Sequence, residues 1–126
     1  MNAVPSSRIT HFSAVFFVSD RKAVLDYYRQ LGFWCDEEMG FAERDGLQMI
    51  FHESDPAREI VPHAPAHGRE ALHVFAMVEG VDRLYEEFKS KGAVFQYELR
   101  TNEYRIREFA IRDPQGYTIG FGESVA

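Results

Sequence analysis

The fold is decided by a stretch near the end of the chain, Arg107-Glu-Phe-Ala-Ile-Arg-Asp113-Pro-Gln-Gly116-Tyr-Thr-Ile-Gly-Phe121. Two apolar-rich runs flank Asp-Pro-Gln-Gly, in which Asp can bond back to the backbone, Pro presets φ and Gly takes a positive φ. The stretch therefore predicts a β-hairpin. A shortened version, Phe41-Ala-Glu-Arg-Asp-Gly46-Leu-Gln-Met-Ile-Phe51, has the same order of Phe-Ala-X-Arg-Asp, turn and strand. A hairpin that occurs twice suggests a unit that occurs twice.

The rest of the chain repeats in the same way. A shift of 60 positions aligns Gly32 with Gly92 and Tyr28 with Phe88 without a gap. In each half, a strand rich in Val and Phe precedes apolar residues at i, i+3, i+4 and i+7, the spacing of a helix, and then a glycine that would end the helix. Three further strands follow each glycine. The sequence therefore predicts an α+β fold built from duplicated βαβββ modules.

The 126 residues fit a single domain. Module one is expected at about residues 9–53 and module two at about 71–123. Residues 54–70 are rich in Pro, Gly and charged side chains, which predicts a linker. Asp20 is the expected N-cap of the first helix. The expected strands are residues 9–19, 33–38, 40–44, 47–53, 71–79, 93–98, 104–112 and 117–122.

Composition argues against several classes of function. The formal net charge of −6 disfavours nucleic-acid binding, which depends on Lys and Arg, and permits attraction of a cationic ligand. No apolar run approaches the roughly 18 residues of a membrane span, and no secretory signal is evident. The single cysteine, Cys35, cannot form an internal disulfide and fits a reducing cytosol. We therefore expect a cytoplasmic protein without a membrane or nucleic-acid partner.

The duplication and two motif blocks carry a family resemblance. The blocks are Val18-Ser-Asp20 with the following Tyr27-Tyr-Arg-Gln-Leu-Gly-Phe33, and the hairpin at residues 107–121. Together they resemble the vicinal oxygen chelate superfamily, which includes glyoxalase I, extradiol dioxygenases and bleomycin resistance proteins. The resemblance implies that each module forms a curved, mostly antiparallel sheet with its helix outside. It also implies a cavity enclosed by the sheets, and a homodimer.

Metal-dependent members of this superfamily take ligands from the first and fourth strands of each module. The corresponding positions here are Ser13, Ile50, His73 and Gly120. Ile and Gly offer no metal-binding side chain, and a catalytic site normally has about three protein ligands. The expectation is therefore no metal and no other cofactor.

A displaced metal site is the alternative. Strand periodicity puts His11 on the face of Ser13 and His52 on the face of Ile50, so both could join His73 beside Glu108. Such a set would suit Zn, Fe or Mn and would make the protein a glyoxalase-like metal-dependent lyase or dioxygenase. The histidines of His63-Ala-Pro-Ala-His67 are interpreted as part of a solvated loop.

The resemblance is strongest to the bleomycin-resistance branch, whose hairpin also reads Arg-Glu-Phe-Ala-(Ile or Val)-Arg-Asp-Pro. It implies a protein without catalytic residues that sequesters a cationic or planar aromatic, bleomycin-like small molecule in a dimer groove. The net charge and the 11 Phe and 6 Tyr are compatible with such a ligand. Glu108 is the expected anion. The expected ligand-binding residues are Glu108, Tyr104, His73, Phe75, His52, Trp34 and Ala110.

A third possibility is a dimeric interaction module without a ligand. The segment before Arg107 lacks the Trp-Gly that many antibiotic-binding members carry, and Tyr117 replaces their usual Asn after the turn. These departures concern the ligand and leave the fold prediction unchanged.

Overall fold

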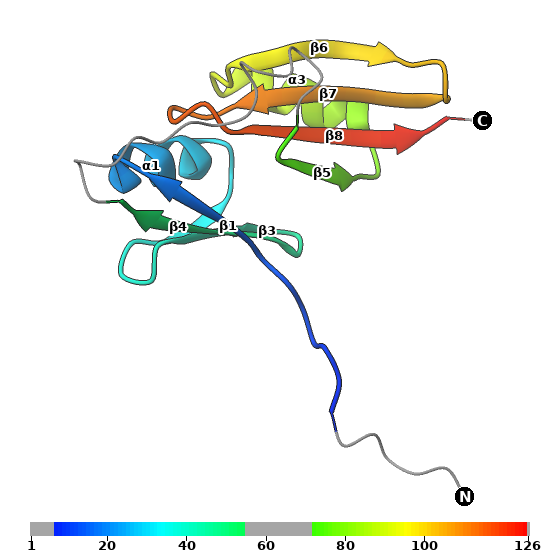
Figure 1. The fold of residues 1–126 in the computed structure, drawn as a ribbon. Helices are drawn as coiled ribbons and strands as arrows, with labels where there is room; N and C mark the ends of the chain where they lie inside the picture. Colours follow the sequence, from blue (N-terminus) through cyan, green and yellow to red (C-terminus); the bar gives the residue numbers. More distant parts are fainter. Residues whose placement is uncertain (1–6, 55–71, 126) are drawn as a thin grey trace, which may run out of the picture.

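The computed structural model describes residues 7–54 and 72–125 and contains two four-stranded mixed sheets, each with one helix (Figure 1). Module one consists of β1 (Ala14–Val18), α1 (Arg21–Gln30), β2 (Trp34–Asp36), β3 (Phe41–Arg44) and β4 (Leu47–Glu53). Module two consists of β5 (Val74–Met77), α3 (Val81–Ser90), β6 (Phe95–Thr101), β7 (Ile106–Arg112) and β8 (Thr118–Ser124). The predicted α+β fold of two βαβββ modules is confirmed.

The two sheets have the same topology. Their strand orders are β1-β4-β3-β2 and β5-β8-β7-β6. In each sheet the first strand runs parallel to the last, and the other neighbours are antiparallel. The parallel pairs have matching registers, with Ala14 opposite Met49 and Val74 opposite Ile119. The repeat in the sequence is therefore a repeat of strand pairing.

The two helices begin in different ways. Asp20 is the N-cap of α1, and its carboxylate accepts a hydrogen bond from the Ala23 N–H at 3.1 Å, as predicted. The N-cap of α3 is Gly80, which has no side chain to accept such a bond. Instead Glu123, on β8, accepts from the N–H groups of Gly80 and Val81 at 3.1 Å each. A tertiary contact thus replaces the local cap.

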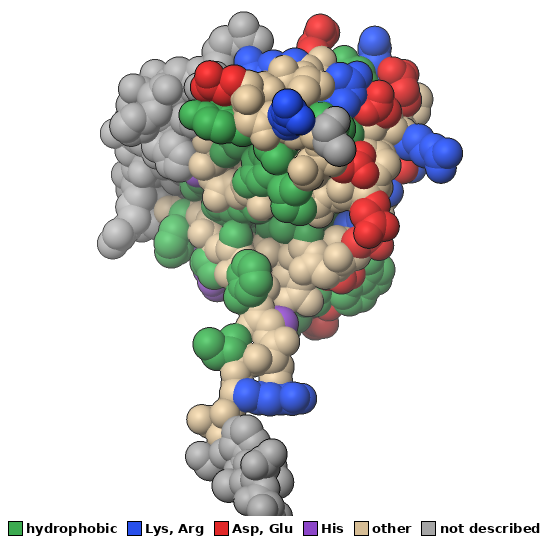
Figure 2. Space-filling view, turned by 90° about the vertical axis from the view of Figure 1, so that its right-hand side faces the viewer, with side chains coloured by type: hydrophobic (Ala, Val, Ile, Leu, Met, Phe, Trp, Pro, Cys, Tyr) green, Lys and Arg blue, Asp and Glu red, His purple; other side chains and the backbone are tan. Residues whose placement is uncertain are grey.

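Each sheet buries one face against its helix. In module one Tyr28 of α1 stacks on Phe51, and in module two Phe88 of α3 packs edge-on against Phe109 and Phe121. All of these rings are buried. The opposite faces are open, because the alternating residues Val15, Phe17, Phe75 and Met77 are exposed. Hydrophobic side chains also gather on the side of the molecule shown in Figure 2.

The modules hold each other through their hairpin turns. Asp113, in the β7–β8 turn, accepts a hydrogen bond from the Tyr28 hydroxyl at 2.9 Å, and both groups are buried. In the opposite direction Arg44, at the end of β3, donates to both carboxylate oxygens of Glu87 on α3, at 2.6 and 3.0 Å. The turn of each module therefore packs against the helix of the other.

The first strand is shorter than predicted. It begins at Ala14, and residues 7–13 leave the body as an arm on which Ile9 and Phe12 are exposed (Figure 1). The reason is register: Ala14 lies opposite Met49, and β4 itself begins at Leu47. In this register Phe12 would lie opposite Leu47, and residues before Phe12 would have to pair with the β3–β4 turn instead of a strand.

Most of the predicted linker, including His63 and His67, lies outside the described residues. No helix in the described part of the chain is both long and apolar enough to cross a membrane.

Candidate functional site

Glu108 is a largely buried carboxylate on the open face of the second sheet. Only 8% of it is exposed, and it accepts hydrogen bonds from the Tyr97 hydroxyl and from Nδ2 of Asn102. Both partners are neutral donors, which suit an ionised carboxylate. None of the ion pairs among residues 7–54 and 72–125 includes Glu108. The site thus holds a buried acceptor that forms no ion pair with a cation in the described part of the chain.

The arginines near Glu108 have other partners. Arg107 donates to Asp82 at 2.7 Å and does not form an ion pair with Glu108. Arg100 lies opposite Glu108 in the β6–β7 register, but its guanidinium stacks on the Tyr97 ring, 4.3 Å from the centroid. Glu108 therefore keeps its two neutral hydrogen-bond donors although two arginines are close to it in the sheet.

Asn102 links Glu108 to the β6–β7 turn. Its Oδ1 accepts from the N–H groups of Tyr104 and Ile106 at 2.8 and 3.1 Å, while its Nδ2 donates to Glu108. The carboxylate is therefore fixed to the same amide that shapes the turn. Tyr104 lies in this turn with 77% of its surface exposed.

Phe75 lies over two glycines beside this carboxylate. A Cβ atom on Gly120 would come within 2.7 Å of the Phe75 ring, and one on Gly122 within 2.5 Å. These distances mean that the ring rests directly on the backbone of β8. Because 43% of Phe75 is still exposed, the outer side of the ring is open. Ala110 pairs with Gly120 in the β7–β8 register and is buried. Glu108, Phe75 and Ala110 are thus brought together on one face.

Trp34 and His52 lie on the open face of the other sheet. Strand register places Trp34 beside Glu43 and Gln48, and His52 is four residues further along β4 on the same side. Trp34 is 60% exposed and packs edge-on against Phe41, while the His52 ring lies 5.7 Å from that of Phe17. This face presents aromatic rings and one imidazole. Among the described residues no hydrogen bond or ring contact joins it to Glu108 or Phe75.

His73 lies at the junction of the modules. Its Nδ1 accepts a hydrogen bond from the Thr118 N–H at 3.0 Å, so a neutral His73 carries its proton on Nε2. Its ring packs edge-on against Phe16 of module one and against Tyr117. His73 therefore contacts β1 of module one and the start of β8 of module two.

The side chains at the family's metal positions do not fit a metal centre. The Ser13 hydroxyl donates to Gln48 at 2.8 Å, Ile50 is aliphatic, and Gly120 lies beneath Phe75. In the part of the chain that the structure describes, no three His, Cys, Asp or Glu side chains are close enough to hold an ion. His11, which would belong to the displaced site, contacts Thr10. One chain does not assemble the displaced histidine site from these residues.

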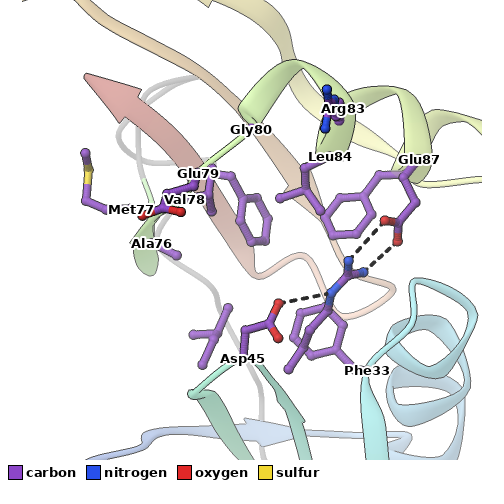
Figure 3. Close-up of a pocket in the computed structure, with 14 residues that line it drawn as sticks. Phe33, Asp45, Ala76, Met77, Val78, Glu79, Gly80, Arg83, Leu84 and Glu87 are labelled. Atoms are coloured by element: carbon purple, nitrogen blue, oxygen red, sulfur yellow. Dashed lines mark hydrogen bonds and ion pairs between the residues drawn. The ribbon is translucent and has the colours of Figure 1, made fainter. Parts of the chain in front are cut away.

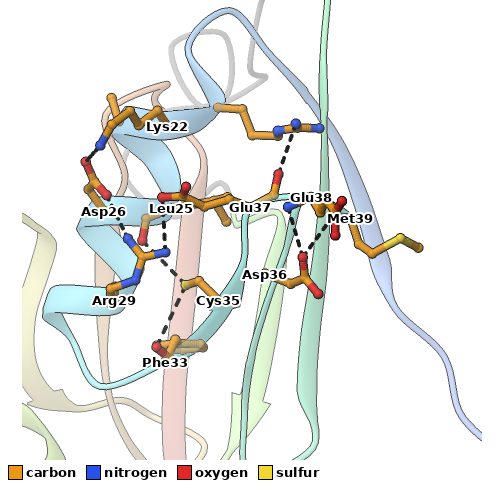
Figure 4. Close-up of polar contacts among 12 residues, drawn as sticks. Lys22, Leu25, Asp26, Arg29, Phe33, Cys35, Asp36, Glu37, Glu38 and Met39 are labelled. Atoms are coloured by element: carbon orange, nitrogen blue, oxygen red, sulfur yellow. Dashed lines mark hydrogen bonds and ion pairs between the residues drawn. The ribbon is translucent and has the colours of Figure 1, made fainter.

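Cys35 does not offer a reactive thiol. It lies on β2, where its Sγ donates to the Leu25 carbonyl oxygen at 3.4 Å (Figure 4). Burial raises the pKa of this thiol, so the thiolate that would act as a nucleophile is disfavoured. Nearby, Arg29 links Asp26 and Glu37 on the surface.

Tyr97 and Asn102 are site residues that sequence periodicity does not identify. Strand β6 changes register between Phe95, which lies opposite Ile111, and Tyr97, which lies opposite Ala110. This irregularity turns Tyr97 to the face of Glu108. Asn102 lies beyond the end of β6 at a turn, so an Asn in the Thr101-Asn-Glu-Tyr104 segment was the one available signal.

Comparison with known proteins supports a single family. The Glyoxalase/Bleomycin resistance protein/Dioxygenase superfamily matches residues 8–121. No curated protein sequence matched the chain. Solved structures with a similar fold include a glyoxalase/bleomycin resistance protein/dioxygenase from Alicyclobacillus acidocaldarius, with 20% identity over 92% of each chain and a TM-score of 0.68.

Two further structures resemble the chain to a similar degree. One is a glyoxalase/bleomycin resistance protein/dioxygenase from Nocardioides, with 19% identity, coverage of 97% of this chain and 87% of that one, and a TM-score of 0.65. The other is a glyoxalase-related enzyme from Clostridium phytofermentans, with 19% identity, coverage of 95% and 98%, and a TM-score of 0.64. At these identities the likeness concerns the fold. Since the family match covers both modules, the chain belongs to the glyoxalase/bleomycin resistance protein/dioxygenase superfamily.

Proposed function

We propose that the protein is a metal-free small-molecule binding protein, related in function to bleomycin resistance proteins, that sequesters a cationic ligand with a planar aromatic part. The observation that carries this proposal is that Glu108 and Phe75 lie on one face of the second sheet, with the Phe75 ring over Gly122, the strand partner of Glu108. Glu108 is a buried carboxylate held by neutral donors, and Phe75 beside it is an aromatic ring with one side open. The Glu108 carboxylate can bind a cation, and the Phe75 ring can stack on an aromatic ring of the same ligand.

The energetics of this pair favour a ligand with both features. A cation that reaches Glu108 makes a charge-assisted hydrogen bond in a partly desolvated place, where such bonds are strong. A flat ring stacked on Phe75 buries apolar surface on both partners. The net charge of −6 adds long-range attraction for the cation. Binding then requires no chemical step.

The proposed site is completed by a second copy of the chain. Each open sheet face exposes large hydrophobic side chains, including Phe17 and Trp34 on one sheet and Phe75 and Met77 on the other. Exposed apolar surface of this kind is typical of interfaces. A homodimer that sets the Trp34 face of one copy opposite the Phe75 face of the other would enclose a groove. The open side of Phe75 would then face the ligand.

Titration of bleomycin and simpler cationic planar compounds tests the binding role. Glu108→Gln keeps the size of the side chain and removes its charge; its amide oxygen can still accept from Asn102, and its amide NH2 can donate to the Tyr97 hydroxyl oxygen. It should weaken binding by about 10- to 100-fold, as expected for loss of a hydrogen bond to a charged group. Glu98→Gln, on the exposed side of β6, is the matched control and should bind as the unchanged protein does. Equal affinity of the two variants would refute the role of Glu108.

The alternative function is a metal-dependent lyase or dioxygenase, since one similar structure is described as a glyoxalase-related enzyme. Metal content of protein purified without added metal separates the two. The binding proposal expects less than about a tenth of an equivalent. It also expects no thermal shift with Zn, Mn, Fe or Ni. If the purified protein carries nearly one equivalent of metal and the His73→Ala variant loses it, the binding proposal is wrong and the metal-dependent enzyme takes its place.

A further inference from the structure

A hollow lies on the helix side of the module junction. It has a volume of about 630 Å³, and its walls come from the β3–β4 turn, the end of β5 and the first turns of α3 (Figure 3). The ligand-binding residues of the proposed groove, including Glu108, Phe75 and Trp34, do not line it, and Met77 is the one residue named for the open faces that does. In Figure 2, hydrophobic side chains occupy the middle of the side of the molecule towards which the β3–β4 turn points.

The hollow exists because the two modules have turns of different length. At the equivalent corner on the other side, the Asp-Pro-Gln-Gly turn extends into module one. There Gln115 accepts from the N–H and hydroxyl of Ser19 at 2.8 and 3.0 Å, and the Tyr117 hydroxyl donates to the Phe17 carbonyl oxygen at 2.7 Å. These side chains fill that corner.

The β3–β4 turn has only Asp45 and Gly46 in place of those four residues. The shift that relates the modules aligns Ser19 with Glu79, yet no hydrogen bond among the described residues joins Glu79 to the β3–β4 turn. The shorter turn therefore leaves open the space that the longer turn fills at the other corner. An open corner of this origin is present in the folded chain before any ligand arrives.

The floor of the hollow is apolar and its rim is charged. The floor consists of Phe33, Leu47, Ala76, Leu84, Phe88 and Phe121. On the rim, the Arg44 guanidinium is already engaged, because it donates to Glu87 and to the Leu31 carbonyl oxygen. Arg83 is an exposed rim cation on α3.

Two rim carboxylates remain for a ligand. The Asp45 side chain is 91% exposed and lies 3.7 Å from Nε of Arg44, a loose contact, and it points into the hollow from the turn (Figure 3). Glu79 lies on the opposite wall and forms no ion pair with a described residue. Three carboxylates and two guanidiniums line the space, so its net charge is negative.

We propose that this junction pocket is a second binding site, for a small cationic amphiphile. The apolar body would lie on the Leu84, Phe88 and Phe121 floor, and its ammonium or amidinium group would lie between Asp45 and Glu79. Apolar enclosure supplies most of the affinity, and the two carboxylates select the sign of the charge. The site does not depend on Glu108 or Phe75, because neither residue lines the pocket and only Met77 lies both on the open sheet face and on the pocket wall.

Amide NMR spectra of the ¹⁵N-labelled protein distinguish the two sites. The probes are a naphthylmethylammonium salt, naphthylacetate and the neutral naphthylmethanol, which share one ring system. Gly80, which lines the junction pocket, and Gly46, which lies between the lining residues Asp45 and Leu47, report on that pocket, while Gly120 and Gly122 report on the face beneath Phe75. The ammonium compound should shift Gly46 and Gly80, and naphthylacetate should bind there more weakly. Shifts confined to Gly120 and Gly122, tighter binding of naphthylacetate, or no shift would overturn the proposal.

Variants of the rim sharpen the test. The double substitution Asp45→Asn with Glu79→Gln removes both charges at exposed positions, and Asn tolerates the positive φ of 52° at position 45. It should weaken binding of the ammonium compound roughly tenfold, as expected for two solvent-exposed ion pairs. Glu86→Gln, exposed on the same helix but outside the pocket, should leave the affinity unchanged. Equal affinities of the double variant and this control would overturn the assignment of the carboxylates.

Filling the hollow tests its origin. Replacing Asp45 and Gly46 by the four-residue sequence of residues 113–116 lengthens the turn to that of the closed corner. In a chain that keeps its amide dispersion, binding of the ammonium compound at Gly80 should be lost. Undiminished binding would show that the short turn does not create the site.

Discussion

Asp113 does more than shape a turn. Its Oδ1 accepts from the N–H groups of Gln115, Gly116 and Tyr117 at 2.9 to 3.1 Å, and its Oδ2 accepts from the Tyr28 hydroxyl of the other module. Local turn chemistry and the tie between modules thus meet in one carboxyl group. Burial raises its pKa from an ordinary 3.8 to about 6, against the effect of these hydrogen bonds.

Stability should depend on pH through Asp113. Because its pKa is raised in the folded state, the stability gained by its protonation is fully present below about pH 4 and is lost as the pH rises through about 6. Asp113→Asn is neutral at every pH. The free energy of unfolding of the variant minus that of the unchanged protein should therefore grow by roughly 2 kcal/mol between pH 4 and 7. Urea unfolding across this range measures it, and a constant difference would contradict the raised pKa.

Gly120 is required by its neighbours. A Cβ atom there would lie 2.7 Å from both the Phe75 ring and Leu72, closer than real Cβ contacts allow. Gly120→Ala should therefore cost about 1–3 kcal/mol of unfolding free energy, the usual cost of overpacking.

The cost of Gly120→Ala should fall in a chain that also carries Phe75→Ala, because the ring is the larger obstacle. A double-mutant cycle by denaturant unfolding measures this coupling, which we expect to be about 1 kcal/mol. Additive effects of the two substitutions would mean that the ring does not rest on the glycine.

At the scale of the elements, the two helices show how a repeat can keep its fold while changing its contacts. The start of α1 depends on Asp20, a residue of its own segment, whereas the start of α3 depends on Glu123 from the last strand. The hydrogen bonds from Gly80 and Val81 lower the pKa of Glu123. The first N–H groups of α3 therefore have their hydrogen-bond acceptor only when β8 is in place.

Glu123→Ala should loosen the start of α3. The N–H groups of Gly80 and Val81 would lose their acceptor, so the melting temperature should fall and these two amides should exchange with solvent faster. Glu123→Gln keeps an acceptor oxygen, so its melting temperature and amide exchange rates should lie between those of Glu123→Ala and those of the unchanged protein. Exchange that is the same in all three proteins would show that solvent caps the helix equally well.

At the scale of the whole molecule, the open sheet faces are the main apolar surface that a single chain leaves exposed to solvent. Phe17 is 58% exposed, so a charged residue there costs the isolated chain little but would be buried in the proposed dimer. Phe17→Glu should therefore shift the protein from dimer to monomer in sedimentation and leave its far-UV circular dichroism unchanged.

Val94→Glu places the same charge at another exposed apolar residue, 49% exposed and outside the open faces, and should remain dimeric. A monomeric unchanged protein at micromolar concentration would contradict the proposed dimer.

Local patterns predicted most of the elements because their causes are local. The glycines that end the helices take positive φ, +90° at Gly32 and +84° at Gly92, as their positions after the apolar spacing indicated. The fourth strand, Leu47–Glu53, has the predicted bounds. The first strand was predicted too long, since β-propensity in residues 9–13 carries no information about where the partner strand begins.

The candidate site was less accessible to sequence. Glu108 could be placed on the open face because the family resemblance assigns Ala110 to the cavity and alternation adds Glu108, whereas periodicity alone did not select this face. Its partners Tyr97 and Asn102 could not, because a register change in β6 decides which way Tyr97 points. His73 is grouped with Phe75 by strand parity, yet β5 begins only at Val74, and the His73 ring contacts Phe16 and Tyr117. Side chains alternate between the two faces of a sheet only where the strand is continuously paired, and His73 lies before β5 begins.

The sequence by itself determined the duplicated α+β fold, the turns and the absence of a full set of metal ligands at the family's positions, because periodicity, glycine placement and residue chemistry are written locally. Only the tertiary structure decided that Glu108 is held by neutral donors, that Phe75 rests on Gly120 and Gly122, and that one junction corner is filled while the other is open. These features depend on which side chains from distant segments come within contact distance, and that is set by strand register and by the packing of one module on the other.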